Sequence, residues 1–186
     1  MMQSSQKIQL KDKVFKPYIS AEKINLAIKE VSDKINSELD GENPLFLVIL
    51  NGSFMFAADL LRKITISCNI SFIKVASYHG VSSSGSVTEL IGLTEDIKDR
   101  KVVIIEDIVD TGTTLEKLYH LLQQRHVKDI RIATLLFKPE AYKKAINVDY
   151  PGLIIPNDFV VGYGLDYDGL GRNLPEIFVL DPNHGK

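Results

Sequence analysis

The sequence predicts an α/β fold, with a parallel-sheet core flanked by helices and a small hood lobe formed by the two ends of the chain. Residues 45–50 form a continuous apolar run, which is typical of a strand buried on both faces of a parallel sheet, and residues 101–107 predict another buried strand. Helical patterns alternate with these runs, which indicates right-handed βαβ crossovers. The length of 186 residues suits one domain. We expect its core at about 20–150 and its hood at about 1–19 and 151–186.

The first predicted helix covers residues 20–39. Ser20 suits the cap position that opens it, and Gly41 suits the turn that ends it. Its apolar residues recur at helical spacing and form one stripe, made of Ile24, Ile28, Val31, Ile35 and Leu39. Further helices are predicted at 54–64 and 114–124. Strands are predicted at 45–50, 69–77, 101–107 and 129–137.

The carboxyl ends of these strands define where a ligand binds, because open parallel sheets bind ligands in the crevice beyond those ends. Residues 78–87 are rich in glycine and serine and predict a mobile loop beside this crevice. Residues 154–180 combine short β-like pieces with many turn residues, which predicts a small lobe over it. The loops expected to meet there follow Leu50, Ser77, Glu106 and Phe137.

Composition and charge exclude several classes of protein. The formal net charge of −2 gives no excess of basic charge that would draw the chain to nucleic acid or an anionic membrane. Cys68 is the single cysteine, so no intrachain disulfide forms, which fits a reducing compartment. The first residues lack the apolar core of a secretory signal, and the longest apolar run is too short to cross a bilayer. We expect a soluble cytoplasmic protein without nucleic-acid or membrane partners.

The most informative segment is VVIIEDIVDTGTTL, residues 102–115. A buried strand ends in Glu106 and Asp107, and the run Asp110-Thr111-Gly112-Thr113-Thr114 then opens a helix. The glycine allows a tight turn and a close approach to a ligand. The first amides of the helix lack intrahelical partners, and together with the helix dipole they favour a dianionic phosphate. The threonine hydroxyls can donate further hydrogen bonds.

The two carboxylates need a different partner, because they would repel a phosphate. Glu106 and Asp107 suit the two hydroxyls of a ribose, or a Mg²⁺ that bridges ribose and pyrophosphate. Phosphate at one end and a diol at the other indicate ribose 5-phosphate. A D-T-G turn alone is common in α/β proteins, but the run E-D-x-x-D-T-G-x-T between a strand and a helix is far more specific. It is neither a Walker A loop nor a G-x-G-x-x-G turn.

Residues 102–115 resemble the signature of the type I phosphoribosyltransferases, and other motifs resemble the hypoxanthine-guanine phosphoribosyltransferase family over about residues 45–180. These motifs are ILNGSF at 49–54, Ser77-Tyr78 with the Gly/Ser stretch behind it, LLFKP at 135–139, and FVVGYGLDY at 159–167 followed by Arg172. The resemblance implies a purine-salvage enzyme that uses Mg²⁺. It would transfer the phosphoribosyl group of phosphoribosyl pyrophosphate to N9 of hypoxanthine or guanine, as a homodimer or homotetramer.

The resemblance also implies roles around the ribose 5-phosphate. Asp110 would act as the acid/base near purine N7. Glu106 and Asp107 would hold the ribose diol and its metal, and Asp166 would bind Mg²⁺ largely through water. The 5′-phosphate would be held by Asp110, Thr111, Gly112, Thr113 and Thr114.

Around the purine, the resemblance implies that Lys138 donates to the 6-oxo group, Phe159 stacks on the ring, and the Val160 backbone meets the 2-position. An ammonium can only donate hydrogen bonds, so Lys138 suits a 6-oxopurine and would reject the 6-amino group of adenine. Ser77 and Tyr78 would belong to the long loop that closes during turnover, since an oxocarbenium-like ribose must be kept from water.

Asn51, Gly52 and Arg172 would grip pyrophosphate. One departure from the family lies here, because its members usually carry lysine where this chain has Asn51. A role for the backbone survives this change. A charged side-chain contact to pyrophosphate, or across a subunit interface, does not.

Three alternatives remain open from the sequence. The first is a regulator with this fold that binds RNA or DNA, which the absence of a dense Lys/Arg cluster disfavours. The second is a relative specific for xanthine and guanine, which the shape of the hood around Phe159 would decide. The third is a flavodoxin-like binding module, for which the residue run at 106–114 would be unusual.

Overall fold

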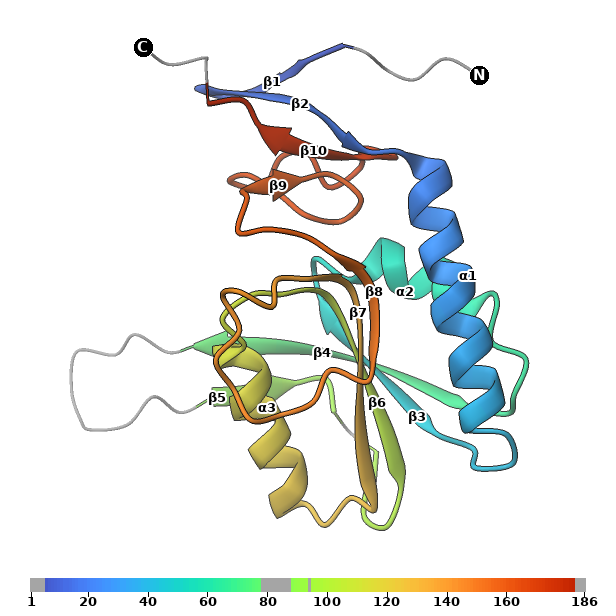
Figure 1. The fold of residues 1–186 in the computed structure, drawn as a ribbon. Coiled ribbons are helices and arrows are strands. Elements are labelled where there is room, and N and C mark those ends of the chain that lie inside the picture. Colours follow the sequence, from blue (N-terminus) through green and yellow to red (C-terminus); the bar gives the residue numbers. More distant parts are fainter. Residues whose placement is uncertain (1–5, 78–87, 94, 183–186) are drawn as a thin grey trace, which may run out of the picture.

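Two sheets organise the chain (Figure 1). The computed structural model describes residues 6–77, 88–93 and 95–182. The larger sheet has the order β5-β4-β3-β6-β7-β8, and the smaller one the order β1-β2-β10-β9. The core strands are β3 (Leu45–Leu50), β4 (Asn69–Ser77), β5 (Thr88–Ile91), β6 (Lys101–Val109), β7 (Asp129–Phe137) and β8 (Tyr150–Ile154). All their pairings are parallel except the one between β4 and β5. The predicted parallel core is therefore confirmed.

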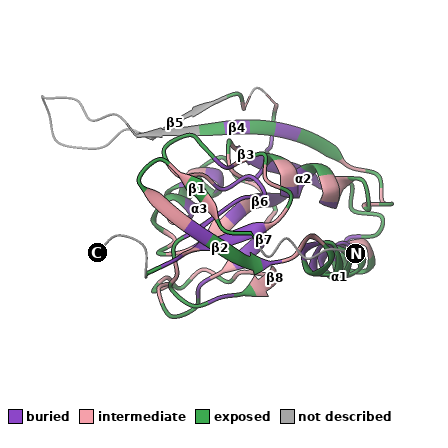
Figure 2. Cartoon of the chain, turned by 90° about the horizontal axis from the view of Figure 1, so that it is seen from above, coloured by how far each residue is buried: buried purple, intermediate pink, exposed green. Residues whose placement is uncertain are grey.

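Strand β3 shows why the sheet reads as continuous apolar runs. Its side chains alternate between two hydrophobic clusters, one on each face of the sheet. Phe46 and Val48 pack with the buried stripe of helix α1 (Ala21–Glu38). Leu45, Leu47 and Ile49 pack with the buried face of helix α3 (Thr113–Gln124). Figure 2 shows the buried positions in the centre of the molecule, between these layers.

The helices agree with the predicted ones in number and place within the described residues. Ser20 caps α1 by accepting a hydrogen bond from the Lys23 amide, and Gly41 follows the helix in a left-handed conformation. Helix α2 (Phe54–Leu61) is shorter than the predicted 54–64. The chain turns after Leu61 because the Ile64 amide bonds only three residues back, to the Leu61 carbonyl. No helix of the described residues is both long and apolar enough to span a bilayer.

Two strands of the core sheet lie outside the prediction, as do β1 and β2 of the hood. Strand β5 pairs antiparallel with β4, so that Thr88 lies opposite Ser77. Strand β8 joins the core sheet next to β7, although residues from 151 onward were expected in the hood. A close backbone approach makes this possible, because a Cβ on Gly152 would lie 2.8 Å from the Leu135 carbonyl oxygen. Strand β6 also runs two residues past its predicted end at 107, through pairs that join Ile108 and Val109 to β7.

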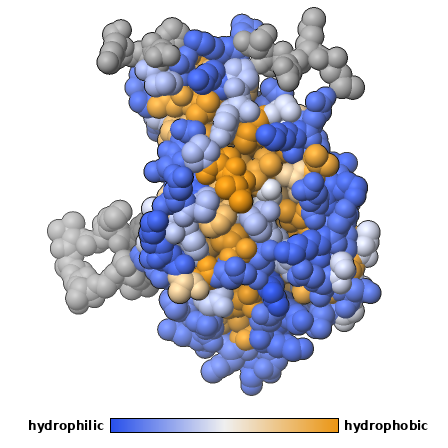
Figure 3. Space-filling view, in the orientation of Figure 1, coloured by the Kyte–Doolittle hydropathy of each residue, from blue (hydrophilic) through white to orange (hydrophobic). Residues whose placement is uncertain are grey.

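The hood is an antiparallel sheet built from both ends of the chain. It contains β1 (Ile8–Leu10), β2 (Lys13–Ile19), β9 (Val160–Val161) and β10 (Ile177–Leu180). Phe15, Val161 and Phe178 form its small core. It sits beyond one end of the large sheet, and α1 runs from it along the core (Figure 1). Hydrophobic residues gather where the two lobes meet on the face shown in Figure 3.

Candidate active site

The turn between β6 and α3 lines a hollow that is open to solvent. Its lining runs from Glu106 through Asp110 and the threonines to Leu115. The first helical hydrogen bond runs from the Glu116 amide to the Gly112 carbonyl, so the amides of residues 113–115 precede the regular bonding of α3. Thr111, Thr113 and Thr114 are exposed. The first amides of α3 and three threonine hydroxyls, those of Thr111 and Thr113 lying 3.3 Å apart, thus share one hollow with the Glu106 carboxyl group.

Gly112 gives this turn its shape. Its φ of 76° is left-handed, which costs a residue with a Cβ. A Cβ there would also lie 2.3 Å from the Tyr142 ring. Tyr142 is anchored by a hydrogen bond from its hydroxyl to the Ile146 carbonyl at 2.7 Å. The segment after β7 therefore packs directly against the turn.

Glu106 and Asp107 are adjacent carboxyl groups, of which Asp107 is buried and Glu106 is partly buried. Glu106 Oε2 is shielded from solvent and has no hydrogen-bond partner within the described part of the chain. Burial raises the pKa of Glu106 well above its usual range, and the neighbouring Asp107 adds to the effect. Burial also raises the pKa of Asp107, although the positive charge of Arg172 is among the influences that oppose the rise. Within the described residues, Glu106 Oε2 thus lacks a donor or counter-ion, which a diol or a cation would supply, whereas Asp107 Oδ1 accepts from the Ile108 amide at 3.0 Å.

Asp107 lies against the first loop of the core. A Cβ on Gly52 would be 1.7 Å from Asp107 Oδ2, so a larger residue here would displace the Asp107 side chain. The Leu50–Asn51 peptide bond just before it is cis. The hood reaches the same loop, because a Cβ on Gly164 would lie 2.0 Å from the Gly52 carbonyl oxygen. Core and hood therefore touch at the backbone next to Asp107.

Arg172 holds the hood side of this junction. Its Nη1 donates to the Gly164 carbonyl at 2.7 Å, and its Nη2 lies 2.7 Å from Asp166 Oδ1. Asp166 also accepts from the Gly169 amide at 2.7 Å. Asp166 is thus engaged by Arg172 and does not complete a cluster with the carboxyl pair. No group of three metal-binding side chains occurs in the described ranges.

Lys138 and Asp110 come together from different loops. Lys138 Nζ lies 2.9 Å from Asp110 Oδ2, although 28 residues separate them. The lysine side chain is 7% exposed and the aspartate side chain 42%. The ammonium group is therefore nearly buried, whereas the carboxylate is accessible. The sequence named both residues but did not predict their contact.

Phe159 is an accessible aromatic on the hood, with 46% of its surface exposed. Its ring centroid lies 6.1 Å from that of Phe15 and 5.9 Å from that of Tyr167. Val160 is buried at the start of β9. Ser77 ends β4, whereas Tyr78 and the predicted closing loop lie outside the described residues.

Sequence reasoning did not single out Tyr163 or Asp59, which join the two lobes. The Tyr163 hydroxyl donates to Asp59 Oδ2 at 2.5 Å across 104 residues. The only signal for it in the sequence is the pair of glycines at 162 and 164 that flank the tyrosine.

Comparisons with known proteins agree over most of the chain. Residues 18–168 match the phosphoribosyl transferase domain. The chain is 42% identical over 172 residues to the hypoxanthine-guanine phosphoribosyltransferase of Streptococcus pneumoniae strain R6, covering 92% of this chain and 96% of that protein. The crystal structure of a hypoxanthine phosphoribosyltransferase from Staphylococcus aureus superimposes with a TM-score of 0.82 and 42% identity, covering 90% of this chain and 91% of that one.

A longer relative matches as well. The bifunctional protein TilS/HprT of Listeria innocua serovar 6a is 42% identical over 90% of this chain, which spans 26% of that protein's length.

Replacing Gly112 with alanine tests the close packing of the turn. We expect Gly112→Ala to lower the free energy of unfolding more than Gly41→Ala does. The two glycines have nearly equal φ angles of 76° and 77°, but nothing lies within 4 Å of a Cβ at Gly41. Urea denaturation of both variants measures the difference. Equal losses would show that the contact with Tyr142 carries no cost.

Replacing Glu106 with glutamine tests the desolvated carboxyl group. A raised pKa means that ionisation destabilises the folded protein as pH rises above the ordinary value of 4.5. The glutamine variant avoids this loss. We therefore expect its stability relative to the unmodified protein to increase from pH 5 to about pH 8.

Urea denaturation at each pH measures this difference, with Glu30→Gln on the exposed face of α1 as the control. We expect the control difference to stay flat. A flat profile for Glu106→Gln would contradict the desolvation of Glu106.

Proposed function

Because the chain belongs to the hypoxanthine-guanine phosphoribosyltransferases, we propose that it transfers the 5-phosphoribosyl group of phosphoribosyl pyrophosphate to N9 of hypoxanthine or guanine. The products are IMP or GMP and pyrophosphate, and the role is purine salvage. The observation that carries the proposal is the single hollow shared by Glu106 and the start of α3. A flavodoxin-like binding module is excluded by the family, while use of xanthine stays an open part of the substrate range.

The 5′-phosphate occupies the hollow in this proposal. The amides at residues 113–115 and the exposed hydroxyls of Thr111, Thr113 and Thr114 donate to its oxygens. The ribose hydroxyls then donate hydrogen bonds to Glu106 and Asp107. These bonds replace the water that the carboxyl groups lack in the free protein. Binding of the sugar therefore also gives the two carboxylates their hydrogen-bond partners.

Asp110 and Lys138 read the purine. Purine N7 and O6 are neighbouring atoms on one edge of the base. The 2.9 Å separation of Lys138 Nζ and Asp110 Oδ2 lets one group meet each atom. Asp110 accepts or holds the proton at N7 while N9 attacks, and Lys138 donates to O6. Phe159 stacks on the ring from the hood, and the Val160 backbone meets the 2-position.

Positioning and charge stabilisation provide most of the rate, because the ribose becomes oxocarbenium-like as pyrophosphate leaves. The Asn51-Gly52 backbone and Arg172 hold the departing pyrophosphate. Arg172 would exchange part of its bond with Asp166 for a phosphate oxygen, a partner that arginine matches well. Asn51 contributes through its backbone, since it lacks the charge of the lysine that the family usually carries.

Mg²⁺ is the implied cofactor, and the residues fit it. The unpartnered, shielded Glu106 Oε2 next to Asp107 is a donor set that suits a hard cation. Mg²⁺ commonly takes only one or two protein carboxylates and completes its shell with water and substrate phosphates. Glu106 and Asp107 would hold it on the ribose side and Asp166 through water. When bound, the ion neutralises charge on pyrophosphate.

Self-association as a homodimer or homotetramer is also proposed. Ile70 and Phe72 are exposed on one face of β4, and Phe54 is exposed at the start of α2. Such apolar side chains suit a contact between subunits. Light scattering of the purified protein measures the oligomeric state. Cytoplasmic location remains a prediction, motivated by the single cysteine, Cys68.

Asp110→Asn separates chemistry from binding. Asparagine keeps an oxygen that accepts from Lys138 but cannot take a proton. We expect kcat to fall about 10²-fold or more, with little change in the affinity for phosphoribosyl pyrophosphate. Steady-state kinetics and titration calorimetry measure the two quantities. The control is Asp33→Asn in the exposed Lys29–Asp33 pair on α1. Equal losses of rate and affinity would make Asp110 a binding residue instead.

Lys138→Ala tests base selection and, with it, the proposed function. Protein, Mg²⁺ and phosphoribosyl pyrophosphate are mixed with hypoxanthine, guanine, xanthine or adenine, and nucleotide formation is followed. We expect the unmodified protein to use hypoxanthine and guanine and to use adenine poorly. The variant should bind the purine more weakly or accept a wider range of bases. Lys29→Ala is the control. Unchanged selectivity would remove the role given to Lys138.

A further inference from the structure

A strongly bent segment of the hood lies against the core at residues 162–164. Gly162, Tyr163 and Gly164 have φ angles of 99°, 50° and 100°, so three left-handed residues follow one another. A Cβ on Gly162 would lie 2.1 Å from the Glu176 carbonyl oxygen, which ties this residue to the hood. Tyr163 is the one residue of the three with a side chain. It therefore adopts a backbone conformation that side chains disfavour, and its surroundings must fix it there.

Backbone bonds fix this segment within the hood. The Tyr163 amide donates to the Leu174 carbonyl at 2.9 Å, and the Gly164 amide donates to the Arg172 carbonyl at 2.9 Å. The Arg172 guanidinium returns a bond to the Gly164 carbonyl. The position of Arg172 thus depends on the same segment.

The Tyr163 side chain leaves the hood and enters the core. It is 5% exposed and belongs to the hydrophobic cluster that contains the α1 stripe. Its hydroxyl donates to Asp59 Oδ2, on the helix that begins two residues after Gly52. Burial and the bond to Asp59 raise the pKa of Tyr163 above its usual range, so the hydroxyl remains a donor at neutral pH.

Two contacts therefore join the hood to α2 and the loop before it. One is the packing of Gly164 on the Gly52 carbonyl, and the other is the bond from Tyr163 to Asp59. The packing of Gly164 lets the two backbones approach closely, but it includes no hydrogen bond that would fix their orientation. The second is a directional hydrogen bond to a carboxylate, and hydrogen bonds to charged acceptors are among the stronger ones.

We propose that Tyr163 is a positioning residue, whose bond to Asp59 fixes the Asn51-Gly52 loop relative to the hood that carries Arg172 and Phe159. The inference rests on the proposed function, because it takes Gly52 and Arg172 as the two sides of the pyrophosphate site. Pyrophosphate must contact both sides at once. Without the bond from Tyr163 to Asp59, the distance between Gly52 and Arg172 would vary more widely, and the purine would be misaligned with ribose C1.

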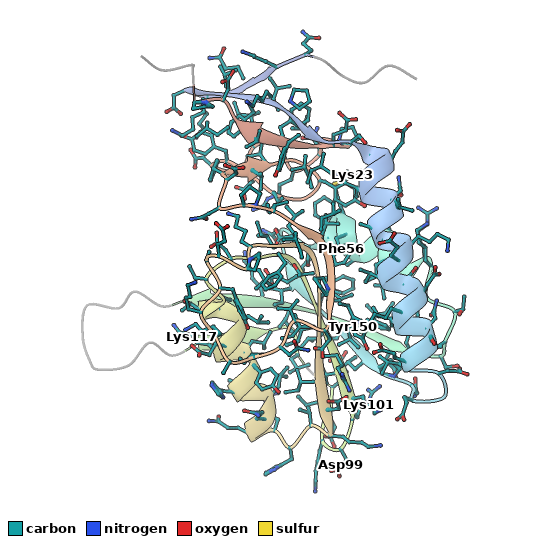
Figure 4. All side chains as sticks on the ribbon, viewed as in Figure 1. Lys23, Phe56, Asp99, Lys101, Lys117 and Tyr150 are labelled. Atoms are coloured by element: carbon teal, nitrogen blue, oxygen red, sulfur yellow. The ribbon has the colours of Figure 1, made fainter. Side chains whose placement is uncertain are left out.

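The test compares two tyrosines that lose only a hydroxyl. Tyr163→Phe breaks the joint between the lobes. Tyr150→Phe breaks a bond of the same kind, from a fully buried tyrosine to Glu38 Oε2 at 3.0 Å, but within the core beside α1 (Figure 4). We expect Tyr163→Phe to lower kcat/KM for phosphoribosyl pyrophosphate by about 10-fold or more, because small misplacements cost rate. Tyr150→Phe should change it less than about 2-fold while losing a similar amount of stability.

Variants of the acceptor complete the test. Asp59→Asn keeps an oxygen for Tyr163 and should retain most activity, whereas Asp59→Ala should match Tyr163→Phe. The double variant should lose no more than either single variant, because both remove one bond.

Equal kcat/KM values for Tyr163→Phe and Tyr150→Phe, in an unmodified protein that forms nucleotide, would overturn the positioning role alone. Additive losses in the double variant would also overturn it. Absence of nucleotide formation by the unmodified protein would instead overturn the proposed function.

Discussion

The desolvation of Glu106 and Asp107 is the constraint on which the rest of the site depends. Two carboxyl groups beside each other in a poorly solvated place are unfavourable unless something neutralises them. Asp107 lies directly against Gly52, where any added side chain would displace it, and the Arg172 charge is among the influences that oppose the rise of its pKa. The free protein therefore contains an unfavourable pair of carboxyl groups. The proposed sugar would donate hydrogen bonds to this pair, and the proposed cation would supply the opposite charge. The stability that the folded protein loses through this pair would be recovered when the proposed ligands bind.

The sheet places every part of this arrangement at one edge. Strand β6 runs on past the carboxyl pair and then turns at Gly112 into α3, so the acids and the helix amides stay within one turn of chain. Strand β3 delivers Gly52 beside Asp107, and β7 delivers Lys138 beside Asp110. The hood brings Arg172 to the same place, through its bond with the Gly164 carbonyl beside Gly52. Figure 4 shows Asp99 and Lys101 at the opposite end of the sheet, away from the hood.

Local patterns in the sequence were enough for the four central strands and the three helices, because periodicity shows which of their residues are buried. The stripe of α1 and the buried run of β3 are read directly from spacing. Strand β8 was missed because its approach to β7 depends on Gly152, whose neighbours lie on another strand. The pairs Lys138–Asp110 and Tyr163–Asp59 join residues far apart in sequence, and no local pattern predicts a side-chain contact of that kind. The identity of the site residues came from motif resemblance, whereas their contacts came only from the structure.

The composition of the hood sheet has a consequence for how the chain matures. Strand β2 pairs with β10, so that Phe15 lies opposite Leu180. The last strand of the core sheet ends at Ile154, whereas β10 ends at Leu180, so every core strand is made before the partner of β2. Synthesis releases the N-terminal part first. The core sheet can therefore form on the ribosome while β2 still lacks its neighbour, and the hood sheet can be completed only after residues 177–180 have emerged.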